Sequence, residues 1–505
     1  MPMSVIKKEI ETEKLIGYRY VQTLCRAESL VNGAGREAVV PLLYDASAAV
    51  ISTDIQNDRL IINATLHCQA VYRQGEESTL RALSAKTSVA QAIDIQDAQP
   101  GMLSRVEMQV EHVDARYENG HMHFQAAVGI RAWLMTLEKV EAISDITEKD
   151  SIEMKYEEAE FVKLAAEADE TAVMTAEIDL PHSLDARNTL MDWGCVLVDS
   201  VQADLGGIRV KGRAMIETLV SSGIEGRPAV VVKYPIEFDK LIELPEWLRE
   251  NAVVRAQVRG IRTQIDHDDD AEEGKLHIQA DIHFSIAANI REKVVLLADA
   301  YGSGSDRIEA SCREICACSE AQSTQAVETL RGTVITEDGS AAIGSIIAVR
   351  VQPNIAEISS DAGIGKISGI MEADVLYMPA GGLLPASTRA ELPFELEIAQ
   401  PLQEDSLVRL NVVSAEANAL MSDRIEMKVL LCAECETRRT KTYSIITGID
   451  SMPQEKRKPG YVICWPGNKD DAWSIGKRYG IKEADINAAA GQEGISAGKY
   501  LVLNV

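Results

Sequence analysis

The 505-residue sequence has few aromatic residues and no long apolar run. Phe, Trp and Tyr together make up 5% of the chain, whereas Val, Ile and Ala are plentiful. No stretch of about 18 consecutive apolar residues occurs, which excludes a membrane-spanning helix. The first 20 residues contain neither the apolar core nor the cleavage site of a secretory signal. We therefore expect a cytoplasmic protein that is not inserted in a membrane.

Basic residues are also scarce relative to acidic ones. The chain has 51 Lys and Arg against 78 Asp and Glu, a formal net charge of -27. The segment after residue 450 is slightly basic, so the acidic excess lies in the first 450 residues. Because an acidic surface repels nucleic acid and anionic membranes, we exclude both as partners.

The nine cysteines are odd in number and irregular in spacing, which indicates a reducing compartment rather than a disulfide framework. Cys312, Cys316 and Cys318 are close enough to be metal ligands, with a fourth from Cys432 or Cys435. The same segment also fits the apolar stripe of a helix, in which free cysteines pack as small apolar side chains. We favour the helix stripe, and we predict no metal and no other cofactor.

Three parts of the chain repeat one another. Segments 60–72, 208–220 and 366–377 align, and each has a partial alternation of apolar and polar residues that predicts a strand. Further strands recur in the same order around them. Asn119-Gly120 joins two of these strands and predicts a type I′ hairpin turn, which needs positive φ at both central residues.

The repeats predict a mainly β protein with three tandem β-rich modules, each an antiparallel sandwich, followed by a small α+β domain. The predicted limits are 18–148, 170–302 and 325–450 for the modules, and 459–505 for the last domain. The boundaries between them fall in three polar segments, of which the last is expected to be a linker. These segments are 147–170, which is acidic and helix-prone, 303–325 and 451–460.

The last 45 residues predict a compact β-α-α-β unit, which we name the tail. A short strand (461–464) precedes a helix that begins after Asp470 or Asp471 and has apolar residues on one face. Gly480 fits the left-handed position that ends this helix. A second helix begins near Lys482, and a closing strand covers 500–505.

This tail resembles the LysM domain, a binding module, through Trp473-Ser474-Ile475, Lys477–Ile481 and Ile486-Asn487. LysM domains usually bind cell-wall glycan through two loops. Here those loops depart from the LysM pattern, at 469–471 and 497–499, and the first is enlarged at 465–468. Because the glycan-binding loops are altered, we expect the tail to bind a protein. The alternative is a wall-associated protein that binds peptidoglycan.

The tandem modules, with the related segments YPIEF (234–238) and LPFEL (392–396) and the LysM-like tail, resemble the spore-coat assembly (SPOCS, DUF3794) family. The resemblance implies a coat morphogenetic protein in the mother-cell cytoplasm, at the forespore surface. It implies that the tail binds an ATPase coat scaffold, SpoIVA. Other coat proteins and self-association are further expectations for the modules.

The candidate site lies on the tail, and no catalytic site is expected. No acid, base and nucleophile assemble in a reproducible way along the repeats, so we predict a scaffold that is not an enzyme. Trp465, beside a loop, is a candidate hot spot for binding, whereas Trp473 is predicted to belong to the core. The candidate partner-binding residues are Trp465, Lys469, Asp470, Lys477, Ile495 and Ser496.

Overall fold

The computed structural model describes residues 4–33, 38–147, 152–266, 274–303, 306–336, 339–453, 460–491 and 494–504. Of the described residues, 79% are in strands and 5% are helical, which confirms the predicted mainly β fold with a small α+β region at the C-terminus. Part of the expected 451–460 linker, residues 454–459, lies outside the described residues.

Each of three modules consists of six strands in two three-stranded antiparallel sheets. Module 1 has sheets β1-β6-β5 and β2-β3-β4, module 2 has β7-β12-β11 and β8-β9-β10, and module 3 has β13-β18-β17 and β14-β15-β16. The strands of module 1 are β1 (Val5–Leu30), β2 (Val39–Gln56), β3 (Arg59–Gln74), β4 (Leu80–Asp94), β5 (Leu103–Glu118) and β6 (His121–Ile146).

The strands of module 2 are β7 (Ile152–Leu180), β8 (Ala186–Asp204), β9 (Gly207–Ile224), β10 (Arg227–Glu243), β11 (Ala252–Asp266) and β12 (Gly274–Gly302), with short 3-10 turns η1 (His182–Leu184) and η2 (Glu246–Asn251). The strands of module 3 are β13 (Asp306–Ile335), β14 (Ile343–Asp361), β15 (Ile364–Pro379), β16 (Ala386–Ile398), β17 (Leu407–Met421) and β18 (Arg424–Pro453).

The alternation seen in the sequence determines which side chains enter each core. In β3, Leu60, Ile62 and Leu66 are buried between the two sheets of module 1 together with side chains of the other strands. The β5–β6 turn is the predicted one, because Asn119 and Gly120 have φ of 53° and 86°.

The shared YPIEF and LPFEL segments have a common physical role. Phe238 lies opposite Gly212 on the neighbouring strand, and Phe394 lies opposite Gly369. A Cβ at Gly212 would lie 2.6 Å from the Phe238 ring, and one at Gly369 would lie 2.9 Å from the Phe394 ring. The aromatic rings therefore cover the two glycines, and a larger residue there would clash with the ring and, more closely, with the backbone carbonyl of Leu197 or Asn354.

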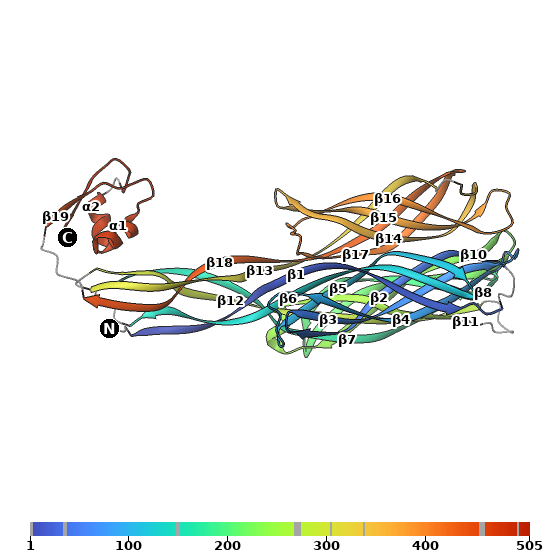
Figure 1. The fold of residues 1–505 in the computed structure, drawn as a ribbon, viewed down its shortest axis with the longest axis horizontal. Helices are drawn as coiled ribbons and strands as arrows, with labels where there is room; N and C mark the ends of the chain where they lie inside the picture. The colour runs from blue at the N-terminus through green and yellow to red at the C-terminus, as the bar shows by residue number, and fades with distance from the viewer. Residues whose placement is uncertain are drawn as a thin grey trace.

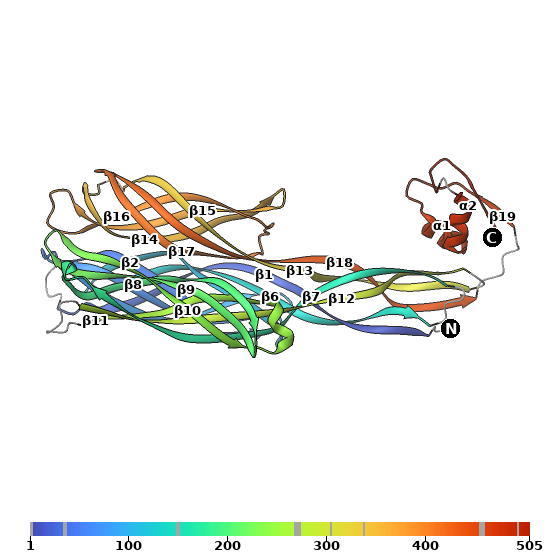
Figure 2. The ribbon, with the colours of Figure 1, turned by 180° about the vertical axis from the view of Figure 1, so that it is seen from behind.

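The longest strands extend beyond the sandwiches and form a stalk (Figures 1 and 2). They pair as three two-stranded ribbons, β1–β6, β7–β12 and β13–β18. The apolar faces of the ribbons meet along the stalk, where Ile10, Phe161 and Tyr443 belong to one buried cluster. Because an isolated two-stranded ribbon is marginally stable in water, each ribbon depends on the other two.

Two of the polar segments in which boundaries were expected are largely strands of this stalk. The acidic segment 147–170 lies largely in β7, where Phe161 is buried against the other ribbons while acidic side chains face solvent. Segment 303–325 lies largely in β13, so the predicted helix stripe with Cys312 is wrong. Pairing with β12 and β18 overrides the local helical preference. The module limits stay predictions; residues 18, 170 and 325 lie inside strands β1, β7 and β13.

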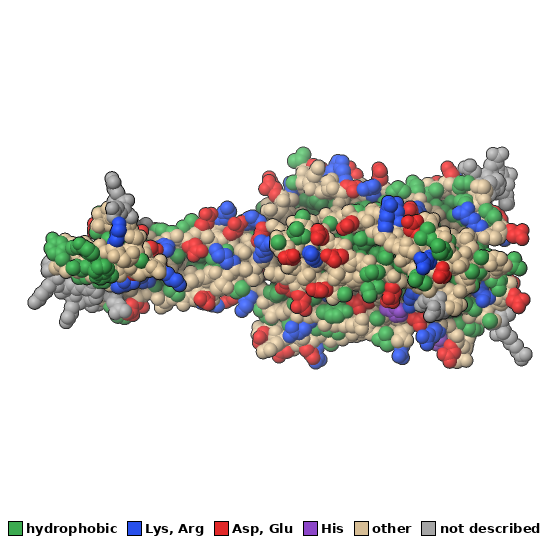
Figure 3. Space-filling model, turned by 90° about the horizontal axis from the view of Figure 1, so that it is seen from above, with side chains coloured by type: hydrophobic (Ala, Val, Ile, Leu, Met, Phe, Trp, Pro, Cys, Tyr) green, Lys and Arg blue, Asp and Glu red, His purple; other side chains and the backbone are tan. Residues whose placement is uncertain are grey.

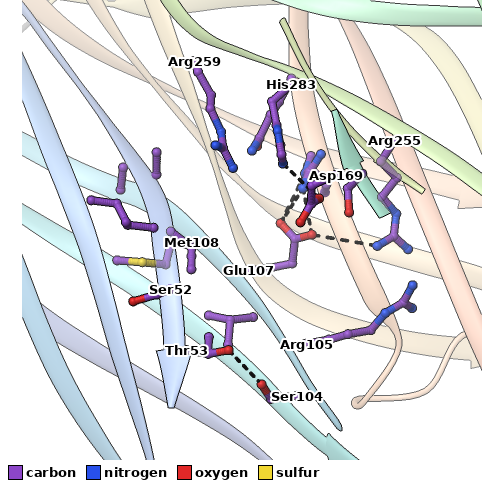
Figure 4. Close-up of a pocket in the computed structure, with 18 of the residues that line it drawn as sticks. Ser52, Thr53, Ser104, Arg105, Glu107, Met108, Asp169, Arg255, Arg259 and His283 are labelled. Atoms are coloured by element: carbon purple, nitrogen blue, oxygen red, sulfur yellow. Dashed lines mark hydrogen bonds and ion pairs between the residues drawn. The ribbon is translucent and has the colours of Figure 1, made fainter. Parts of the chain in front are cut away.

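The three sandwiches together form a part of the molecule that we name the head. A cluster of buried charges joins the modules where the head meets the stalk (Figure 4). Glu107, Arg255 and Arg409 each stand three residues before a β-bulge, at matching places in β5, β11 and β17. Arg409 donates to Glu107 at 2.7 Å, and Arg255 lies 3.9 Å from Glu107. Equivalent positions of the three modules therefore meet at one point.

Glu436 of β18 forms the second centre of this cluster. Its carboxylate accepts from Arg105 of module 1 at 2.5 Å, from Arg255 of module 2, and from Arg438 of its own strand at 3.3 Å. Arg438 in turn donates to Glu13 of β1 at 2.6 Å. Glu436 thus links all three modules through charge-assisted hydrogen bonds.

We predict that Glu436→Gln destabilises the protein by about 3–5 kcal/mol, because it leaves three buried arginines without their shared counter-ion. Urea unfolding measures the loss. Glu141→Gln, which breaks the exposed pair with Lys7, is the matched control and should cost less than about 1 kcal/mol. Equal losses for the two variants would contradict the central role of Glu436.

The same carboxylate predicts a loss of stability in acid. Burial alone would raise the pKa of Glu436, but the charges of Arg105, Arg255 and Arg438 outweigh it and lower the pKa from 4.5 to about 2. The stability it contributes is present above about pH 4.5 and is lost as the pH falls towards about 2. Burial raises the pKa of nearby Glu434, so its protonation in acid favours the folded state and opposes the loss from Glu436. The free energy of unfolding of wild type and of Glu436→Gln, measured between pH 6 and 2, isolates the Glu436 contribution. If the two free energies fell in parallel with pH, this contribution would be contradicted.

Candidate binding site

The tail has the predicted β-α-α-β order. Its elements are β19 (Tyr461–Cys464), α1 (Ala472–Tyr479), α2 (Glu483–Ala490) and β20 (Leu501–Asn504), and β19 pairs antiparallel with β20. Asp471 begins α1: its carboxylate accepts from the Ser474 amide at 2.8 Å, and its own amide donates to the Ser474 hydroxyl at 2.9 Å. Gly480 ends α1 with φ of 68°, as predicted.

The tail has an apolar core of its own. Cys464, Ile475, Ile486, Leu501 and Leu503 are buried in it. Because successive residues of a strand point to opposite faces, the residues of β19 and β20 that alternate with these core positions face solvent.

Those outward residues form an exposed apolar surface, which we name the aromatic face. The rings of Trp465 and Tyr500 pack with their centroids 5.6 Å apart, and Ile463 lies opposite Val502 in the strand register. Apolar side chains gather at this end of the molecule (Figure 3). The exposed fractions are 78% for Tyr461, 60% for Ile463, 64% for Trp465, 59% for Tyr500 and 48% for Val502.

The opposite side of the tail rests on the tip of the stalk (Figures 1 and 2). The Trp473 indole N–H donates to the Asp299 carboxylate at 2.8 Å, and Lys477 donates to the same carboxylate at 2.6 Å. The Tyr301 ring packs edge-on against Trp473, and its hydroxyl donates to the Ile481 carbonyl at 3.0 Å. Helix α1 therefore faces β12, which leaves the aromatic face open to solvent.

The predicted site residues are divided among different surroundings. Trp465 lies on the aromatic face, and Lys469 and Ser496 are exposed in the two loops. Ile495 packs partly against the tail core, and Lys477 contacts the stalk. Their role in binding stays a prediction. Trp473 is buried at the contact between the tail and the stalk, where its ring packs on Tyr301, and it does not belong to the tail's own apolar cluster.

Asp470 holds the loop that follows Trp465. Its carboxylate accepts from the Gly467 amide at 3.0 Å and from Arg478 at 2.8 Å. The hydrogen bond from Gly467 and the pairing with Arg478 lower the pKa of Asp470. These bonds fix the loop, and with it the position of Trp465 beside Tyr500.

Sequence reasoning missed Tyr461, Ile463, Tyr500 and Val502 of the aromatic face. The alternation of Tyr461, Ile463 and Trp465 was a possible signal. Such alternation is equally typical of a strand whose second face is covered by another sheet.

Part of module 1 matches one known family model. The family model described as SipL, SPOCS domain matches residues 42–118. This segment is similar to the SPOCS domain of SipL. The SPOCS match begins in β2 and ends with β5, so it includes Arg105 and Glu107 of the charge cluster. No curated protein and no solved structure matches the chain.

Two further features bear on the class of protein. None of the helices in the described part of the chain has the length and apolar character needed to cross a membrane. Within the described ranges, no group of three or more His, Cys, Asp or Glu side chains is arranged to hold a metal ion. In β13, Cys312 and Cys316 are exposed, whereas Cys318 is buried.

We predict that Asp299→Asn combined with Tyr301→Ala releases the tail from the stalk, because it removes the shared carboxylate and the ring that α1 packs against. Lys477 should then react faster with an acetylating reagent, as mass spectrometry of the labelled peptides measures, while exposed Lys482 should react as before. The control is Asp281→Asn, which changes another residue of β12 and breaks its pair with Arg262 of β11. An unchanged Lys477 rate in the double variant would contradict the docking.

Proposed function

We propose that the protein is a non-enzymatic scaffold in endospore coat assembly. The SPOCS match supports a role in sporulation. Three modules joined into one head and stalk provide large surfaces, on which other coat proteins or a second copy can dock. Under this proposal the protein acts in the mother-cell cytoplasm, at the forespore surface.

The observation that carries the proposal is the aromatic face on the LysM-like tail. Large exposed apolar surfaces mark interaction sites, and Trp and Tyr are enriched among the residues that dominate binding energy. The tail stands at the far end of the stalk from the sandwiches (Figure 1). We propose that it anchors the protein to a SpoIVA-like coat scaffold.

Peptidoglycan is the second candidate ligand. The Trp465 and Tyr500 rings could also stack on a sugar, which favours this alternative. The altered loops at 469–471 and 497–499 argue against it, because LysM domains bind glycan through those loops.

We predict that replacing Tyr461, Trp465 and Tyr500 by Ser weakens binding of the coat scaffold roughly 30-fold or more, since the loss of one hot-spot residue costs about 2 kcal/mol. Affinity recovery of the full-length protein from sporulating cells measures it. Trp247→Ser is the control, because Trp247 is 61% exposed in the head and should leave recovery unchanged.

Two outcomes separate the alternatives. If deletion of residues 459–505 leaves partner recovery and forespore localisation unchanged, the anchoring role is wrong. If the full-length protein pellets saturably with purified peptidoglycan and the triple Ser variant does not, the aromatic face binds glycan instead.

A further inference from the structure

A cavity of about 280 Å³ lies between the β1–β6 and β13–β18 ribbons, where the head meets the stalk. It is separate from the tail. Its apolar walls come from three strands of these ribbons and from β17 of module 3. The apolar lining residues are Leu15, Trp133, Met135, Cys316, Cys318 and Leu407.

Two β-bulges flank the cavity. The register between β1 and β6 shifts just after the Leu15–Met135 pair, and the register between β13 and β18 shifts just after the Cys318–Thr440 pair. All four residues line the cavity. Bulges bend their strands and are frequent beside functional sites. The ribbons therefore separate at the level where their side chains line this space.

The connection between β16 and β17 closes one side. Residues 403–406 form a turn, in which the Ser406 amide donates to the Gln403 carbonyl at 2.9 Å. The Trp133 indole N–H donates to the Asp405 carbonyl at 2.6 Å and ties this turn to β6. The one polar atom of the Trp133 ring is thus satisfied, and the ring itself is left as an apolar wall.

Four of the charged groups that line the cavity form two ion pairs, whereas Lys14 is exposed at its mouth and Asp405 belongs to the turn. Arg105 donates to Glu436 at 2.5 Å, and Arg438 donates to Glu13 at 2.6 Å. Inside the cavity, away from Lys14 at the mouth, an ionised ligand would have to break one of these two pairs. Burial raises the pKa of the Cys318 thiol to about 11, so this wall is also uncharged at neutral pH. The cavity therefore favours a neutral occupant.

We propose that this cavity binds a small, neutral, mainly apolar molecule. Its volume lies near the lower end of the range for small-molecule sites, and its mainly apolar walls with a few polar groups are typical of them. Lys14 and Thr440 are exposed at its mouth, where the ligand can carry a polar edge. The proposal is independent of the function proposed for the tail.

A ligand bound in the cavity would contact both module 1 and module 3. Leu15 and Trp133 belong to module 1, whereas Cys318 and Leu407 belong to module 3. A ligand that binds the folded protein alone stabilises it in proportion to the logarithm of its concentration. Thermal unfolding therefore reports binding directly.

The test uses indole as the probe and full-length protein. Cys316 and Cys312 are both exposed on β13, but of the two Cys316 lines the cavity. We expect indole to raise the unfolding temperature of wild type and of Cys312→Trp, and to leave Cys316→Trp unchanged, because the new ring fills the mouth. No shift in wild type, or equal shifts in the two Trp variants, would overturn the proposal.

A labelling experiment covers the case in which Cys316→Trp folds poorly. In Cys312→Ser, indole should slow the reaction of Cys316 with a maleimide, whereas in Cys316→Ser it should leave the reaction of Cys312 unchanged. Equal effects on both thiols would show that indole does not occupy the cavity.

The preference for a neutral ligand has its own test. Indole-3-acetate carries the same ring with a carboxylate, and we expect it to need at least about ten-fold higher concentration for the same shift in unfolding temperature. Equal or tighter binding of the acid would contradict the neutral-ligand inference, because the paired arginines would then be accepting an anion.

Discussion

The buried charges around Glu107 and Glu436 are the contacts on which the three-module arrangement depends. Matching positions of the modules hold Glu107, Arg255 and Arg409. Opposite charges therefore meet where the three modules contact one another. Three arginines or three glutamates at one buried point would repel each other. Taking charges out of water is costly, and a buried ion pair is weak evidence for stability. Its clearer effect here is specificity, since each module accepts its own neighbours and not a copy of itself.

The stalk and the tail depend on this arrangement in different ways. The ribbons of the stalk share one set of apolar clusters, so none of them can bury its apolar face unless all three modules are in place. The tail has a core of its own and contacts the stalk mainly through Asp299 and Tyr301. The contact nevertheless matters for binding, because it decides which side of the tail faces solvent.

The chain combines an acidic body with a tail that is apolar on its outer side. The chain has a formal net charge of -27, and acidic surfaces repel nucleic acid and other anionic surfaces. The aromatic face and the cavity between the β1–β6 and β13–β18 ribbons are two places where apolar surface is accessible to a partner or ligand. One lies at the tip of the molecule and the other where the head meets the stalk, so the two can be occupied independently.

The sequence by itself determined the features that depend on neighbouring residues. These are the strands with apolar alternation, the Asn119-Gly120 turn, the Asp471 cap, the Gly480 helix end and the β-α-α-β order of the tail. Tertiary structure alone decided that β7 and β13 are strands of 29 and 30 residues, because the residues they pair with in β12 and β18 lie between 89 and 150 positions away in the sequence. It also brought Glu107 and Glu436 to their arginines, placed Lys477 on Asp299, and left the outer face of β19 and β20 uncovered. Pairing and burial between distant segments determine these features, and the local sequence of a segment does not specify which distant segment it will pair with.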